Sequence, residues 1–164
     1  MTSLSAGNAI PDFVLKNTSG GPVRLSEYQK GGPALVIFFK HECTTCQLAL
    51  PFLEQIYRRC RGGAFQCLGV AEDGKAEAVA FAKEYAIMMP LVLEEPPYAT
   101  SEAFGLTNVP TAFLVDGERR IQFVQVGFSK KAYQELADRA AALAGKPPFA
   151  LFGMAHNVAA LKPG

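Results

Sequence analysis

The sequence predicts an α/β protein with a central mixed β-sheet, helices on both faces of the sheet and an N-terminal β-hairpin. Two apolar runs, 35–39 and 65–71, have the length and composition of strands that are buried on both faces. A helical pattern over 44–60 lies between them, which is the order of a right-handed βαβ unit. Two later strands flank Asp116-Gly117 and predict an antiparallel hairpin, so the sheet should be mixed.

The first elements are short. Residues 11–17 alternate in polarity, and residues 18–22 have the composition of a turn. The return strand over 23–25 completes the hairpin. One helical turn over 26–29 should follow and end in the Gly-Pro sequence at 31–33.

The helix over 44–60 carries one apolar stripe and contains a proline. Pro51 should kink this helix without ending it, because the apolar stripe keeps its phase on both sides of the proline. Gly62-Gly63 should end the helix. The residues expected to face the core are Leu48, Phe52, Leu53, Ile56, Tyr57 and Cys60.

The second half of the chain continues the alternation of helices and strands. We expect helices over 75–86 and 98–104, strands over 90–93, 111–115 and 121–126, and a last helix capped by Ser129 that ends at Gly145. In the helix over 75–86, Val79, Ala82 and Ala86 are expected to face inward, with Phe81 and Tyr85 beside them. In the last helix the residues expected to face inward are Tyr133, Leu136, Ala140 and Leu143.

The length predicts one domain over 1–164, with its core at about 10–143 and an apolar tail over 145–164. The tail segment 149–154 is too apolar to lie free in water, so it should pack on the domain or on a second subunit. We expect a monomer or a weak homodimer. His156 is interpreted as an incidental residue of the tail.

The composition argues against several classes of partner. A net charge of +1 gives no reason to expect binding to nucleic acid or to an anionic membrane. No apolar stretch approaches the roughly 18 residues of a membrane-spanning helix. No signal peptide is visible over 1–11, which predicts a cytoplasmic protein, or a periplasmic or extracytoplasmic one if a leader has been removed.

The motif Cys43-Thr44-Thr45-Cys46 carries the chemical prediction. It follows a buried strand and begins a helix, where the helix dipole and free N–H groups stabilise a thiolate on Cys43. The two-residue spacer lets Cys46 resolve a mixed disulfide formed by Cys43. A structural zinc site would need a second close pair of ligands, whereas Cys60 and Cys67 are expected to be packing residues.

Three features together resemble the thioredoxin superfamily. The first is the strand that leads into the CxxC motif, the second is Pro51 five residues after Cys46, and the third is Val109-Pro110-Thr111 before a strand. The segment 7–13 and the hairpin after it resemble the redoxin branch, which includes alkyl hydroperoxide reductase/thiol-specific antioxidant proteins and thiol–disulfide oxidoreductases.

The resemblance implies a thioredoxin-like fold that exchanges protein thiols and disulfides without a cofactor, using an unidentified electron donor or acceptor. It also implies a cis Pro110 beside the CxxC pair, with the Val109 backbone left to pair with an extended substrate strand. The chain departs from thioredoxin in having Glu42 before the first cysteine and Thr44-Thr45 as the spacer.

The residues around the motif are expected to tune the thiols. Lys40 and His41 would lower the pKa of Cys43, and Glu42 would raise it. Thr44 and Thr45 belong to the same tuning set because they form the spacer. The alternative for the rim residues 40–42 is that they are ordinary solvated loop residues.

A peroxiredoxin-like peroxidase is one alternative function. The peroxidatic motif of that family is PxxxTxxC. With Cys46 as its cysteine, the threonine and proline positions hold Cys43 and Phe39, and with Cys43 they hold Lys40 and Val36. Neither register fits the motif.

The other alternative is a redox-inactive or copper-binding module on the same fold. Such a module would bind copper through Cys43, Cys46 and His41.

Overall fold

The computed structural model describes residues 4–153 and 158–164, and its main element is a seven-stranded sheet. The strands are β1 (Val14–Asn17), β2 (Pro22–Arg24), β3 (Ala34–Phe39), β4 (Gln66–Ala71), β5 (Leu91–Leu93), β6 (Thr111–Val115), β7 (Ile121–Val126), β8 (Phe128–Ser129) and β9 (Leu161–Lys162). The helices are α1 (Leu25–Gln29), α2 (Thr44–Cys60), α3 (Lys75–Glu84), α4 (Ala99–Ala103) and α5 (Lys130–Ala144).

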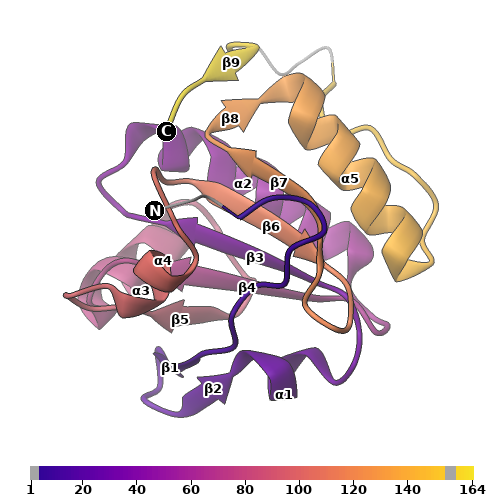
Figure 1. Ribbon diagram of the computed structural model, residues 1–164. Helices are drawn as coiled ribbons and strands as arrows, with labels where there is room; N and C mark the ends of the chain where they lie inside the picture. The colour runs from indigo at the N-terminus through magenta and orange to yellow at the C-terminus, as the bar shows by residue number, and fades with distance from the viewer. Residues whose placement is uncertain (1–3, 154–157) are drawn as a thin grey trace.

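The large sheet is mixed, as predicted. Its strand order is β2-β1-β5-β4-β3-β6-β7, with β3, β4 and β5 parallel and the other pairs antiparallel (Figure 1). The predicted N-terminal hairpin is the β1–β2 pair, and the predicted hairpin around Asp116 is the β6–β7 pair. The β8–β9 pair forms a separate small sheet that the sequence analysis did not predict.

The apolar residues of β3 alternate between two cores. Leu35, Ile37 and Phe39 pack into the core that α2, α3 and α5 cover. The intervening Val36 and Phe38 pack into the core on the other face, where α1, α4 and the segment 10–13 lie. Because β3 is buried on both faces, the continuous apolar run was a correct signal for a central strand.

The carboxyl ends of β3 and β4 lie side by side and position the loops that follow them. Phe39 is paired with Ala71, and the Glu72 N–H donates to the Phe39 carbonyl at 2.9 Å. The loop that leads to Cys43 and the loop that holds Glu72 and Asp73 therefore meet at one edge of the sheet.

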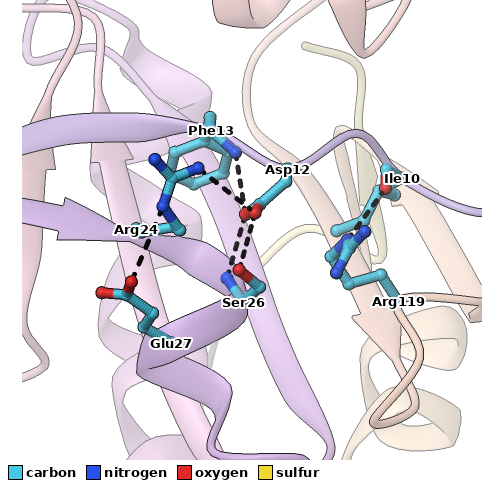
Figure 2. A network of polar contacts seen from close by, with 7 residues as sticks. All are labelled: Ile10, Asp12, Phe13, Arg24, Ser26, Glu27 and Arg119. Carbon is cyan, nitrogen blue, oxygen red and sulfur yellow. Dashed lines mark hydrogen bonds and ion pairs between the residues drawn. The ribbon is translucent and has the colours of Figure 1, made fainter.

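A polar network around Asp12 holds the N-terminal segment (Figure 2). The Ser26 hydroxyl donates to the Asp12 carboxylate at 2.6 Å, and Arg24 lies 3.7 Å from the same oxygen. Burial by itself would raise the pKa of Asp12, but the hydroxyl and backbone donors of Ser26 hold that pKa below its usual value. Arg119 donates to the Ile10 carbonyl at 3.4 Å, which ties this segment to the β6–β7 turn.

Two predicted helix faces were partly wrong. In α3, Val79 is 45% exposed and Ala86 lies beyond the end of the helix, whereas Ala78, which was not predicted, faces the core. Phe81, expected beside the inward face, is buried. In α5, Leu143 is 38% exposed. Alanines occur on several faces of both helices, so the apolar pattern does not define one face sharply. Pro51 lies within one continuous α2, as predicted.

The tail segment packs on the domain. Leu151 is 4% exposed, and the Phe152 ring lies 4.6 Å from the Phe52 ring, centroid to centroid. Gln134 of α5 accepts from the Leu151 N–H at 2.8 Å and donates to the Phe149 carbonyl at 2.9 Å. The interpretations of Met154 and His156 concern positions outside the described residues. None of the helices in the described part of the chain has the length and apolar character of a membrane span.

Candidate active site

Cys43 is the N-cap residue of α2, and its sulfur faces two backbone groups. The Cys46 N–H donates to Cys43 Sγ at 3.1 Å, which places the sulfur at the start of the helix. The Cys43 thiol donates to the Val109 carbonyl at 3.5 Å. The side chain is partly exposed, so this sulfur combines access to solvent with a backbone donor that favours negative charge.

Cys46 lies behind Cys43 and is fully buried. Burial raises the pKa of the Cys46 thiol well above its usual value, and the contact with Cys43 adds to the rise. Both cysteines have free thiols in the structure. The predicted difference in accessibility between the two cysteines is therefore confirmed.

Pro110 follows a cis peptide bond and is buried at the start of β6, as the resemblance implied. Val109 is half-buried, and its carbonyl faces the Cys43 sulfur. The structure thus brings the two predicted substrate-contacting residues beside the cysteine pair, and their role toward a substrate stays a prediction.

Among the rim residues, His41 has a defined partner. The buried Asp73 accepts from the His41 backbone N–H at 2.9 Å and lies 2.5 Å from His41 Nδ1. The hydrogen bond with Asp73 raises the pKa of His41, and Glu42, 3.7 Å from the other ring nitrogen, acts in the same direction. Glu42 is exposed and Lys40 is half-buried, so their tuning roles stay predictions.

The two spacer residues differ. Thr44 is exposed, but Thr45 is buried and its hydroxyl donates to the Pro163 carbonyl at 2.7 Å. Nothing in the sequence of 158–164 predicted that residues so far along the chain reach the CxxC motif.

A carboxyl cluster also lies near the pair. The Ser101 hydroxyl is 2.6 Å from Glu72 and also contacts the buried Glu94, which accepts the Ser101 N–H at 2.8 Å. Burial raises the pKa of Glu72, and the negative charge of Glu94 adds to the rise. This cluster and Asp73 were not predicted. For Glu72 and Asp73 the available signal was their position directly after the apolar run 65–71.

A cavity of about 600 Å³ opens beside Cys43. Its lining residues are Cys43, Glu72, Pro97, Tyr98, Ser101, Glu102, Leu106, Thr107, Asn108, Val109 and Gly164. The cavity gives a small molecule a path to the Cys43 sulfur.

The described residues offer no group of three His, Cys, Asp or Glu side chains placed to hold a metal ion. Cys43, Cys46 and His41 therefore do not form the copper site that one alternative required. Cys60 and Cys67 are buried with free thiols and serve as packing residues, as expected.

The family to which this chain belongs is shown by a match over most of its length. Residues 6–124 match the model of the AhpC/TSA family. The chain belongs to this family. The resemblance to the redoxin branch is therefore confirmed.

The proteins similar to this chain include proteins named as thiol-disulfide oxidoreductases and proteins named as peroxiredoxins. Thiol-disulfide oxidoreductase ResA of Bacillus subtilis is 27% identical over 126 residues, which cover 76% of this chain and 69% of that protein. Peroxiredoxin Q of Sedum lineare is 29% identical over 128 residues, covering 74% and 68%. A putative thiol:disulfide interchange protein DsbE of Chlorobium tepidum has a TM-score of 0.77 at 26% identity, covering 87% of this chain and 100% of that one. These similarities confirm the thioredoxin-like fold.

Proposed function

We propose that this protein is a thiol–disulfide oxidoreductase in which Cys43 attacks a disulfide and Cys46 resolves the intermediate. The observation that supports these roles is the asymmetry of the pair. Cys43 is accessible and receives a backbone N–H, whereas Cys46 is fully buried with a raised pKa. The relatives described as thiol-disulfide oxidoreductases support the same activity.

The reaction transfers two electrons in two exchanges. The Cys43 thiolate attacks one sulfur of the substrate disulfide, whose S–S bond breaks, and the departing sulfur takes the electron pair and then a proton. Cys46 loses its proton and attacks the Cys43 sulfur of the mixed disulfide. The second substrate thiolate leaves, and a Cys43–Cys46 disulfide remains. An external dithiol then reduces the Cys43–Cys46 disulfide and restores the pair. In the opposite direction a substrate dithiol attacks the Cys43–Cys46 disulfide and is itself oxidised, and an external disulfide re-oxidises the pair.

The substrate is a protein disulfide or dithiol in this proposal. Val109 and Pro110 form the wall beside the pair, and the Val109 backbone is the group with which an extended substrate segment would bond. His41, held by Asp73, adds a group with a raised pKa to the loop before Cys43. No metal or organic cofactor is required for these steps.

Substitution of each cysteine tests this function. Cys43→Ser should abolish insulin-disulfide reduction, and Cys46→Ser should accumulate a mixed disulfide with the substrate that dithiothreitol releases. Cys60→Ala is the matched control because Cys60 is a buried thiol without a role in the steps. Reduction of insulin by Cys43→Ser at the rate of the unaltered protein would exclude the proposal.

A peroxidase is the second candidate, because peroxiredoxin Q proteins are among the relatives. Consumption of hydrogen peroxide that depends on Cys43 or Cys46, at rates above those of disulfide exchange, would favour it.

The predicted cytoplasmic location and the predicted monomer or weak homodimer also remain proposals. Cell fractionation and light scattering test them.

A further inference from the structure

Strand pairing and hydrogen bonds hold the segment 160–164, which we call the strap, across the candidate site. β9 pairs antiparallel with β8, and the Lys130 N–H donates to the Ala160 carbonyl at 2.8 Å. Thr45 donates to the Pro163 carbonyl at 2.7 Å, and Asn108 donates to the Gly164 carbonyl at 3.1 Å. In Figure 1 the yellow strand β9 lies beside β8, and the chain continues from it toward the start of α2.

The strap lies against the backbone edge that the proposed substrate needs. A Cβ atom placed on Gly164 would lie 2.5 Å from the Val109 carbonyl oxygen, so the Gly164 backbone lies close to that carbonyl. At Gly127 (φ +74°), a Cβ atom would lie 2.9 Å from the Gly164 nitrogen and 3.0 Å from the Lys162 carbonyl. Glycine at this position permits the close approach of the strap.

Access to Cys43 therefore differs for two classes of substrate. The cavity beside Cys43 is lined on one side by Val109 and Gly164 and leaves a path for a small disulfide. An extended protein segment needs main-chain hydrogen bonds along the Val109 edge. The docked strap places Gly164 beside the Val109 carbonyl, in the space that such a segment would occupy.

We propose that the strap selects between these substrates: small disulfides react with Cys43 while it is docked, and protein disulfides react only after it leaves the Val109 edge. This inference rests on the proposed oxidoreductase function. The apparent rate with a protein substrate is then the rate of the undocked form multiplied by the fraction of molecules in which the strap is undocked. Thr45 and Asn108 contribute to this fraction, because their side chains hold the last two residues of the strap.

The test compares insulin with bis(2-hydroxyethyl) disulfide in single-turnover oxidation of the reduced protein, followed by quenching, alkylation and mass measurement. Thr45→Val removes one strap hydrogen bond, Asn108→Ala removes another, and Thr45→Ser retains the hydroxyl as the matched control. Loss of one such bond should raise the undocked fraction about two- to tenfold. The ratio of the insulin rate to the small-disulfide rate should rise by the same factor in both variants and stay unchanged in Thr45→Ser.

Because the ratio compares two substrates of one protein, any change in the intrinsic reactivity of the cysteine pair affects both rates and cancels. Hydrogen exchange at Leu161 and Lys162 provides the direct readout of strap docking and should be faster in both variants. Faster exchange with an unchanged rate ratio would overturn the strap inference alone. Failure of both disulfides to oxidise the unaltered protein would overturn the proposed function and the strap inference with it.

Discussion

The contact between His41 and Asp73 should make the stability of this protein depend on pH. The Asp73 side chain is 1% exposed and lies 2.5 Å from His41 Nδ1, whereas the His41 side chain is 33% exposed. A hydrogen bond between charged groups contributes about 1.5–3 kcal/mol to the free energy of unfolding. Because the imidazole is partly solvated, we take about 1–2 kcal/mol for this pair.

The direction follows from the pKa of His41 in the folded state. The Asp73 hydrogen bond is the largest effect and raises this pKa, burial opposes it, and the charges of Asp73, Glu42 and Glu77 add to the rise, so the net pKa is raised. The folded protein therefore binds this proton more tightly than the unfolded chain does. The stabilisation is fully present below the ordinary histidine pKa of about 6.5. It is lost as the pH rises through the pKa of His41 in the folded protein.

Urea unfolding at pH 6 and pH 9 measures this effect. His41→Ala should lower the free energy of unfolding by about 1–2 kcal/mol at pH 6 and by less at pH 9, where only a neutral hydrogen bond is lost. Asp73→Asn should reduce the pH dependence in the same way. Glu42→Gln is the control and should change stability by less than about 0.5 kcal/mol, because Glu42 is 73% exposed. A loss in His41→Ala that is equal at both pH values, or larger at pH 9, would refute the reasoning.

Two other predictions concern the thiols and the tail. Limiting iodoacetamide at neutral pH should alkylate Cys43 first, because the other three cysteines are buried. Peptide mapping identifies the labelled cysteine, and labelling of another cysteine first would reverse the assigned roles. Leu151→Ala should lower the free energy of unfolding by about 2–5 kcal/mol, since this side chain is 4% exposed. Leu143→Ala, at a position 38% exposed, should cost much less, and equal losses in a urea titration would contradict the packing of the tail.

The central part of the fold was predictable because its signals are local. The apolar run at 35–39 predicted a strand buried on both faces, and β3 is the strand with a core on each side. Ser129 caps α5 by accepting from the Ala132 N–H, as its residue type indicated. The register of β3 and β6 brings the motif Cys43–Cys46 and Pro110 together. That Pro110 would lie beside the motif was implied by the thioredoxin-like resemblance, not by a local signal.

The parts that sequence reasoning missed depend on distant partners. The apolar composition of 149–152 indicated burial, but not that Gln134 and the Phe52 ring would be its partners. Leu161–Lys162 is too short to have a detectable strand pattern, and its position depends on pairing with β8. Asp73 and Glu72 face the site only because parallel strands end at one edge, a relation that one strand alone does not reveal.

The most direct test of the central claim is the redox state of the four cysteines across a series of dithiothreitol redox buffers. After alkylation and peptide mass mapping, we expect one reversible two-electron disulfide between Cys43 and Cys46, with Cys60 and Cys67 remaining thiols throughout. A protein that keeps all four thiols under oxidising conditions, or whose disulfide involves Cys60 or Cys67, would contradict the central claim.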